Sequence, residues 1–84
     1  MITGKCIVRD QLGIHLRPAK ELCKAATEYK CSIKLVSKNT TANVKSIISL
    51  LGACVKSGEQ VEIICDGDNE NEAFEAIMSI LNRE

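Results

Sequence analysis

Apolar and polar residues alternate with a period of two in four parts of the chain, which predicts four β-strands. The alternation is clearest near the end of the chain, where Val61, Ile63 and Cys65 share one face. The predicted strands, in chain order, are 2–8, 31–37, 41–44 and 60–65. A turn at residues 38–40 is expected to join the two middle strands.

A helical period replaces the alternation in three other segments. The first helix is predicted from Pro18, and its apolar stripe consists of Ala19, Leu22, Cys23, Ala26 and Tyr29. A short helix is predicted at 46–51, and we expect Gly52 to form its C-terminal cap. Asn69 and Glu72 have the spacing of a capping box at the start of the last helix. The apolar stripe of that helix consists of Ala73, Phe74, Ile77, Ile80 and Leu81.

The resulting order β-α-β-β-α-β-α favours an α+β fold, an open-faced β-sandwich. Each of the two longer helices has one apolar stripe, so both are expected to cover the same face of a four-stranded, mostly antiparallel sheet. The opposite face, which carries Lys5, Lys34 and Glu62, is expected to remain in contact with water. Eighty-four residues suffice for one hydrophobic core, so we expect a single domain over residues 1–84.

The charge balance and the cysteine content argue against two classes of function. Eleven basic residues balance 11 acidic ones, and Tyr29 and Phe74 are the two aromatic residues. The basic face and the stacking aromatics of nucleic-acid-binding modules are therefore not evident, and no nucleic-acid partner is expected. The five cysteines form no Cys-x-x-Cys pair and are accompanied by one histidine, so we expect free, mostly buried thiols and neither a metal site nor a cofactor.

The start of the chain does not resemble a signal peptide, because the charged residues Arg9 and Asp10 interrupt the first apolar stretch. No segment has the roughly 18 consecutive apolar residues of a membrane span. Free thiols suit a reducing compartment. We therefore expect a cytoplasmic protein without direct membrane insertion, and nothing in the sequence points to a state other than a monomer.

The segment 13–19, Gly-Ile-His-Leu-Arg-Pro-Ala, carries the candidate chemistry. Pro18 is expected in the first helical turn, where its missing N–H costs nothing, so His15 lies at or just before the helix N-terminus. Free backbone N–H groups at such a terminus form an anion site. The positive helix end and Arg17 both disfavour an imidazolium ion, so we expect a neutral His15 with a lone pair near pH 7. Arg17 also provides a planar cationic fork that suits phosphate oxygens.

The same segment resembles the active-site motif Gly-x-His-x-Arg-Pro-Ala of HPr, the histidine-containing phosphocarrier family of the bacterial phosphoenolpyruvate:sugar phosphotransferase system. Every defined position of that motif is matched. Residues 43–48, Asn-Val-Lys-Ser-Ile-Ile, are similar to the regulatory serine region of the family. The resemblance extends over the whole chain in length, element order and spacing of the two motifs. Leu16, Lys20 and Ser49 depart from the residues common in the family, which concerns the choice of partner more than the phosphate chemistry.

This resemblance implies that Nδ1 of His15 accepts a phosphoryl group from Enzyme I and passes it to the IIA domains of sugar permeases. The backbone N–H groups of Leu16 and Arg17, together with the Arg17 guanidinium, would stabilise the charge on the transferred group. The protein would then be a phosphoryl carrier in sugar uptake, handled as a substrate by other enzymes, rather than an enzyme with independent turnover.

Ser46 is expected to be the N-cap of the short helix, because its side-chain oxygen can accept from an unpaired N–H. The resemblance adds regulatory phosphorylation of Ser46 by an HPr Ser kinase/phosphorylase. Phosphorylation would weaken acceptance from Enzyme I and allow binding to a catabolite-control transcription regulator. A helix N-terminus tolerates negative charge, so the phosphate is expected to change the partners and not the fold.

A short helix cannot bury Ile47, Ile48 and Leu51 at the same time, so some apolar surface is expected to be exposed for docking. Leu16 and Lys20 of the first helix are expected to belong to the same partner-binding surface.

Two other functions compete with the carrier. The first is a regulatory HPr-like adapter that acts through the Ser46 face without phosphotransfer, but such an adapter has no need of His15 as a nucleophile. The second is a small metal-handling domain of the ferredoxin-like kind, which would need the Cys-x-x-Cys loop that this sequence lacks.

Overall fold

The computed structural model describes residues 1–38 and 40–82 of the chain. Its elements, in chain order, are β1 (Ile2–Ile7), α1 (Leu16–Thr27), β2 (Ser32–Ser37), β3 (Thr40–Asn43), α2 (Ile47–Gly52), β4 (Gln60–Asp66) and α3 (Glu70–Leu81). Every predicted strand and helix is present within two residues of its expected limits, and the order β-α-β-β-α-β-α is confirmed. The turn predicted at 38–40 includes residue 39, which lies outside the described residues.

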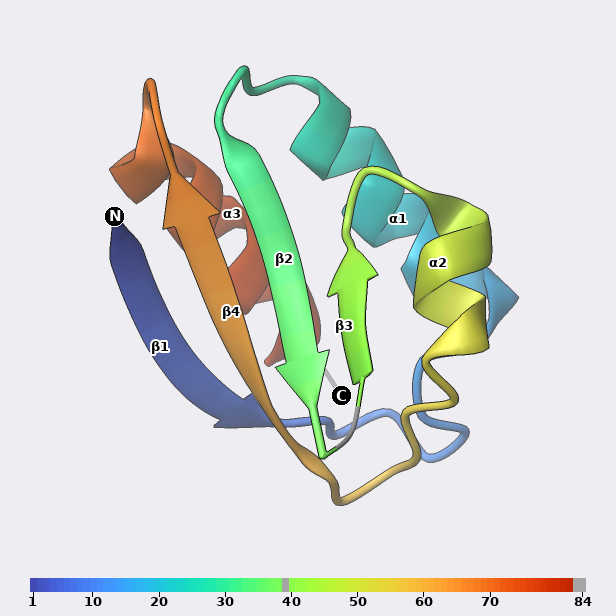
Figure 1. Ribbon diagram of the computed structural model, residues 1–84. Helices are drawn as coiled ribbons and strands as arrows, with labels where there is room; N and C mark the ends of the chain where they lie inside the picture. The colour runs from blue at the N-terminus through green and yellow to red at the C-terminus, as the bar shows by residue number, and fades with distance from the viewer. Residues whose placement is uncertain (39, 83–84) are drawn as a thin grey trace.

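The four strands form one sheet in the order β1-β4-β2-β3, and each described pairing is antiparallel. The last strand of the sequence, β4, therefore lies between β1 and β2. Its Cys65 is opposite Ile2 of β1 on one side and Ile33 of β2 on the other. Helices α1 and α3 pack side by side behind the sheet, and α2 lies beside β3 and α1 (Figure 1). The open-faced β-sandwich is thus confirmed.

One hydrophobic core lies between the sheet and the two long helices. The alternate residues of β2 and β4 that face the helices are buried, as the period of two predicts. The completely buried large side chains include Leu22, Ile33, Leu35, Leu50, Ile63 and Ile77. On the open face, Lys5 and Lys34 are exposed and Glu62 is partly exposed.

The cysteines occupy both buried and exposed positions, and all five are free. Cys31 and Cys65 are buried, whereas Cys54 is exposed and has a positive φ of 52°. Burial, followed by the charges of Cys31 and Glu70, raises the pKa of the Cys65 thiol to about 11. Cys65 is therefore a small core residue that stays protonated.

Two predicted helix caps are wrong. Gly52 is the last residue of α2, and Ala53 is its C-cap in a right-handed conformation. Asn69 does occupy the N-cap of α3, but its backbone is left-handed and its side chain makes no cap hydrogen bond. The N–H of Gly67 donates instead to Oε1 of Glu70 at 3.1 Å. The capping box with Glu72 is therefore absent.

Among the described residues, none of the helices combines the length and the apolar character that crossing a membrane requires.

Candidate functional site

His15 is the N-cap of α1, with an extended backbone (φ −106°, ψ −168°). Its carbonyl accepts the first helical hydrogen bond from the N–H of Ala19 at 3.0 Å. The imidazole makes no cap hydrogen bond and is about one-third exposed, at 32% of its side-chain area. Pro18 is the third helical residue, so it belongs to the first turn as predicted. The ring therefore lies at the helix N-terminus and is reachable from solvent.

The loop before α1 fixes this position through backbone contacts. The N–H of Ile14 donates to the carbonyl of Val55 at 3.0 Å, and Ile14 is buried. Gly13, with φ +72°, turns the chain where a Cβ atom would lie 2.3 Å from the Val55 oxygen. The N–H of Gly13 also donates to the carbonyl of Asp10 at 2.9 Å. Glycine at position 13 thus permits the turn that brings His15 to the N-terminus of α1.

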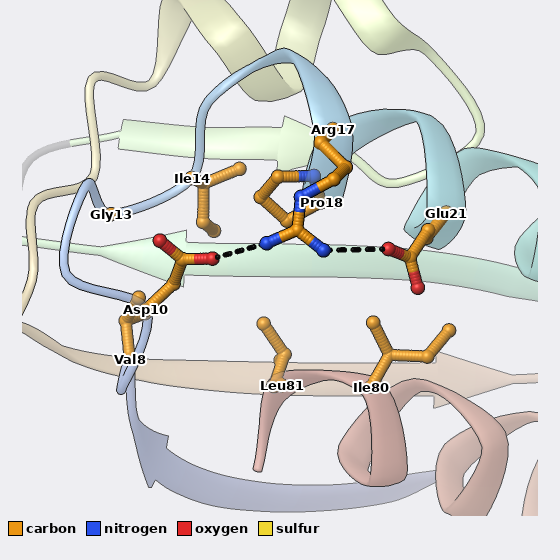
Figure 2. A pocket seen from close by; sticks show the side chains of 9 residues that line it. All are labelled: Val8, Asp10, Gly13, Ile14, Arg17, Pro18, Glu21, Ile80 and Leu81. Carbon is orange, nitrogen blue, oxygen red and sulfur yellow. Dashed lines mark hydrogen bonds and ion pairs between the residues drawn. The ribbon is translucent and has the colours of Figure 1, made fainter. Parts of the chain in front are cut away.

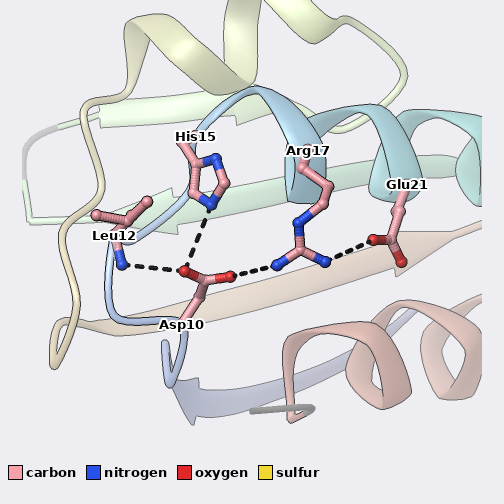
Figure 3. A network of polar contacts seen from close by, with 5 residues as sticks. All are labelled: Asp10, Leu12, His15, Arg17 and Glu21. Atoms are coloured by element: carbon pink, nitrogen blue, oxygen red, sulfur yellow. Dashed lines mark hydrogen bonds and ion pairs between the residues drawn. The ribbon is translucent and has the colours of Figure 1, made fainter.

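The guanidinium of Arg17 is held between two carboxylates (Figure 3). Its Nη2 lies 3.3 Å from Oδ2 of Asp10, and its Nη1 lies 3.5 Å from Oε1 of Glu21, one helical turn later. The side chain is nevertheless 70% exposed. Such exposed ion pairs contribute little to stability, so Arg17 can leave them for an incoming anion at small cost.

Asp10 is the residue at this site that the sequence analysis missed. Its Oδ1 lies 3.4 Å from Nε2 of His15 and accepts the N–H of Leu12 at 3.0 Å, while Oδ2 faces Arg17 (Figure 3). The hydrogen bond from the Leu12 backbone, assisted by the nearby His15 and Arg17, lowers the pKa of the Asp10 carboxyl below its ordinary value.

This carboxylate changes the electrostatics expected for His15. From the sequence, only the positive charge of Arg17 and the positive end of the helix were expected near His15. The structure adds a negative group at Nε2 that also offsets the charge of Arg17. The ring is therefore placed in a balanced set of charges and not beside cations alone.

A hollow of about 100 Å³ lies below Arg17 and does not include His15 (Figure 2). Its apolar walls come from the loop, from α1 and from the end of α3, where Ile80 and Leu81 close it. Only a few water-sized molecules would fit. A second, more open hollow includes both His15 and Asp10 together with Leu12 and Gly58. The chemistry of His15 thus belongs to an open surface and not to a closed pocket.

Helix α2 carries the second set of predicted residues. Ser46 is its N-cap, as predicted, and its Oγ accepts the N–H of Ser49 at 3.2 Å. Ser49 Oγ in turn accepts the N–H of Asn43 at 2.9 Å. Lys45 donates through Nζ to the carbonyl of Tyr29 at 2.6 Å, which joins the segment before α2 to the end of α1.

Several predicted docking residues are exposed on α1 and α2, which pack against each other. Ile48 is 84% exposed, Leu16 is 57% exposed and Leu51 is 37% exposed, whereas Ile47 is partly buried against the core. The expectation that α2 cannot bury all of its apolar residues is therefore confirmed. Lys20 is also exposed, on α1.

Comparison with known proteins identifies the class to which this fold and site belong. The chain matches the family model described as "PTS HPr component phosphorylation site" over residues 2–83. Phosphocarrier protein HPr of Lysinibacillus sphaericus is 38% identical over 81 residues, which are 96% of this chain and 92% of that protein. The histidine-containing phosphocarrier protein of a Mycoplasma superposes with a TM-score of 0.91 at 29% identity, covering 94% of this chain and 90% of the other.

A structure of HPr from Thermoanaerobacter tengcongensis gives a TM-score of 0.92 at 27% identity, covering 96% of this chain and 91% of the other. These matches extend over nearly the full length of both partners. The chain belongs to the HPr family of phosphocarriers of the phosphotransferase system.

Proposed function

We propose that this protein carries a phosphoryl group on Nδ1 of His15, taking it from Enzyme I and giving it to the IIA domains of sugar permeases. In this proposal, residues 1–84 form one domain that carries the phosphoryl group in the bacterial cytoplasm without a cofactor. The protein is a substrate of the enzymes that load and unload it, and it has no turnover of its own.

The observation that carries the proposal is the position of His15 as the N-cap of α1, with an imidazole that is not used for capping. The amide groups of Leu16 and Arg17, at the first two helical positions, have no carbonyl one turn earlier to bond to. Donors of this kind favour an anion on the neighbouring nitrogen. The exposure of the ring also suits a group that two different proteins must reach in turn.

Arg17 is proposed to stabilise the charge on the equatorial oxygens during transfer. Phosphoryl transfer has a loose, in-line transition state, so positioned donors supply most of the stabilisation. Arg17 shares the carboxylate of Asp10 with the ring, is itself 70% exposed, and is held by two partly exposed carboxylates. A phosphoryl group on His15 can therefore attract the guanidinium without breaking a buried contact.

We propose that Leu16, Lys20, Ile47, Ile48 and Leu51 form the docking surface for both the donor and the acceptors. The exposed apolar residues among them, above all Ile48, are support for this role. One surface that must bind several partners in succession favours small, transient interfaces.

Incubation with Enzyme I and labelled phosphoenolpyruvate tests the proposed carrier. One phosphoryl group should be incorporated in an acid-labile, base-stable form, and a IIA domain should remove it. The variant His15→Ala should take up no label while keeping the folded spectrum. A wild-type protein that stays unlabelled would favour the regulatory adapter, which binds its partners through the Ser46 face.

We further propose that Ser46 is phosphorylated by an HPr Ser kinase/phosphorylase and that the modified protein binds a catabolite-control transcription regulator. Ser46 is the N-cap of α2 and lies beside the proposed docking surface, so a phosphate there would change what that surface attracts. Incubation with the kinase and ATP should give an acid-stable phosphoester that is lost in Ser46→Ala. Label that persists in this variant, at Ser49 or Ser32, would refute the assignment.

A further inference from the structure

The carboxylate of Asp10 bridges the two side chains of the proposed phosphate site. One oxygen, Oδ1, lies 3.4 Å from Nε2 of His15, and the other, Oδ2, lies 3.3 Å from Nη2 of Arg17 (Figure 3). Asp10 is five residues before His15 in the sequence, on the opposite side of the turn at Gly13. Its position therefore depends on the folded loop.

The loop holds this carboxylate firmly. The backbone N–H of Leu12 donates to Oδ1 at 3.0 Å, and the N–H of Gly13 donates to the Asp10 carbonyl at 2.9 Å. On either side of the turn, the N–H groups of Val8 and Ile14 donate to the carbonyls of Glu59 and Val55. Side chain and backbone of Asp10 are thus both anchored, and the carboxylate does not reach His15 as a freely rotating surface group.

A neutral imidazole carries one N–H and one lone pair, and a neighbouring acceptor decides which nitrogen keeps the proton. An acceptor at Nε2 holds the proton there and leaves the lone pair on Nδ1. We propose that Asp10 is a positioning residue that fixes His15 in this tautomer and keeps the Arg17 guanidinium beside the ring. This inference rests on the proposed function of His15.

In the proposed transfer to His15, one P–N bond forms and one P–N bond breaks. The lone pair of Nδ1 forms the new P–N bond, while the P–N bond of the phosphohistidine donor breaks and its electron pair returns to the donor nitrogen. The proton on Nε2 stays in place, so the phosphorylated ring becomes more positive during transfer. The Asp10 carboxylate faces that nitrogen and stabilises the developing charge. Its lowered pKa, caused first by the Leu12 N–H, keeps the group ionised.

The variants Asp10→Ala and Asp10→Asn test this role, with Asp68→Asn in an exposed turn as the matched control. The alanine removes every contact of the carboxylate. The asparagine retains an oxygen for the Leu12 N–H but loses the charge, and its amide can also donate to Nε2. If Asp10 served the loop alone, Asp10→Asn would behave like wild type.

The first measurement is the ¹⁵N spectrum of the His15 side chain at a pH where the ring is neutral. Wild type and Asp68→Asn should show the proton almost entirely on Nε2, whereas both Asp10 variants should show a larger share on Nδ1. This measurement needs no donor protein, so it remains decisive if phosphorylation by Enzyme I fails. Equal tautomer populations in all four proteins would overturn the proposal.

The second measurement is the single-turnover rate of phosphoryl transfer from phosphorylated Enzyme I. Loss of a residue that orients a reacting side chain typically costs about 10–100-fold, so Asp10→Ala should be slower by about that factor. Asp10→Asn should be at least as slow as Asp10→Ala, because its amide can donate to Nε2 and so favour the tautomer that has the proton on Nδ1. Transfer at the wild-type rate in folded Asp10→Ala would overturn the proposal and leave the carrier function intact.

Discussion

The backbone of Gly13 determines how the loop delivers His15 to the start of α1. Its φ of +72° is in the left-handed region, and a Cβ atom there would meet the Val55 oxygen at 2.3 Å and Lys56 Cα at 2.8 Å. Both obstacles are backbone atoms and cannot move aside as a side chain would. The position therefore requires glycine for two separate reasons, conformation and space.

A comparison of Gly13→Ala with Gly58→Ala separates these two reasons. Gly58 also has a positive φ, +87°, but an added Cβ would meet nothing within 4 Å. Gly58→Ala should therefore lose only about 1 kcal/mol of stability. Gly13→Ala should lose about 1–3 kcal/mol more, because overpacking is added to the strain. Urea unfolding of both variants measures the difference, and equal losses would contradict the role of the Val55 contact.

Arg17→Glu reverses the charge beside His15 and leaves three carboxylates close together. Because the side chain is exposed, the fold should persist with a stability change of less than about 1 kcal/mol. Transfer from Enzyme I should slow by at least about 100-fold, since a charge-stabilising donor is lost. Lys34→Glu on the open sheet face makes the same change in net charge and should transfer normally. Similar rates in the two variants would show that Arg17 has no specific role.

The sequence predicted the position of His15 but not that Asp10 lies beside it. The motif 13–19 was sufficient to place His15 and Arg17 at the start of a helix, because a proline in the first turn is a local signal. Asp10 belongs to the same site only because Gly13 folds the loop back, with the Ile14 N–H donating to the Val55 carbonyl. That contact is distant in sequence and leaves no local pattern.

At the level of the elements, the helix caps were predicted less well than the helices. Apolar periodicity sums over many residues, so α1 and α3 could be predicted from it. A helix cap depends on the backbone conformation of a single residue, and at Gly52 and Asn69 that conformation differs from the expected one. Asn69 is left-handed, with φ 59°, so its side chain does not cap α3. The left-handed residue after α2 is Cys54 and not Gly52.

Ser46 is the cap that was predicted correctly, and its contribution to stability can be measured. Ser46→Ala removes the oxygen that accepts the Ser49 N–H, which should cost about 1 kcal/mol. Ser79→Ala, at an exposed position inside α3, should instead gain up to about 0.5 kcal/mol, because alanine favours a helix interior. Denaturant unfolding of both variants gives the two values. A Ser46→Ala variant as stable as wild type would contradict the capping role.

Ile48 provides the corresponding test of α2 as a docking element. The side chain is 84% exposed, so Ile48→Glu should leave stability within about 0.5 kcal/mol of wild type. Truncating or charging a central interface residue typically weakens binding by about 2 kcal/mol or more. The Kd of Ile48→Glu for Enzyme I should therefore rise roughly 30-fold. Ser79→Glu, exposed on α3, is the control and should bind normally. Titration calorimetry against Enzyme I measures the affinity of both variants. Equal affinities would contradict the assignment.

Across the whole molecule, an electrostatic contact joins the start of the chain to α3. The amino group of Met1 lies 2.8 Å from Oε2 of Glu70, and Oε1 of Glu70 accepts the Gly67 N–H. Hydrogen bonding to that amino group, then to Gly67, lowers the pKa of the Glu70 carboxyl. The same contact raises the pKa of the amino group. Both groups are at the surface, at the edge formed by β1 and α3.

These shifts predict the pH dependence of the stability difference between wild type and Glu70→Gln. A carboxyl whose folded-state pKa is lowered stabilises the protein above its unfolded pKa, and this stabilisation disappears as the pH falls through the folded value. The raised pKa of the amino group sets the other limit, because the contact is lost as the pH rises through it. Thermal unfolding should show the largest difference near neutral pH. Glu72→Gln is the control, and a difference that does not depend on pH would contradict the assignment.

The position of β4 between β1 and β2 has a consequence for biosynthesis. The ribosome delivers β1 first, yet its strand partner in the described sheet is the last strand to be made. A nascent chain that ends before β4 can pair β2 with β3 but must leave the first strand unpaired. Val55, which anchors the loop before His15, also emerges late. The imidazole therefore reaches its working position only after Val55 and β4 have emerged, and a product truncated before them would carry the histidine without the site.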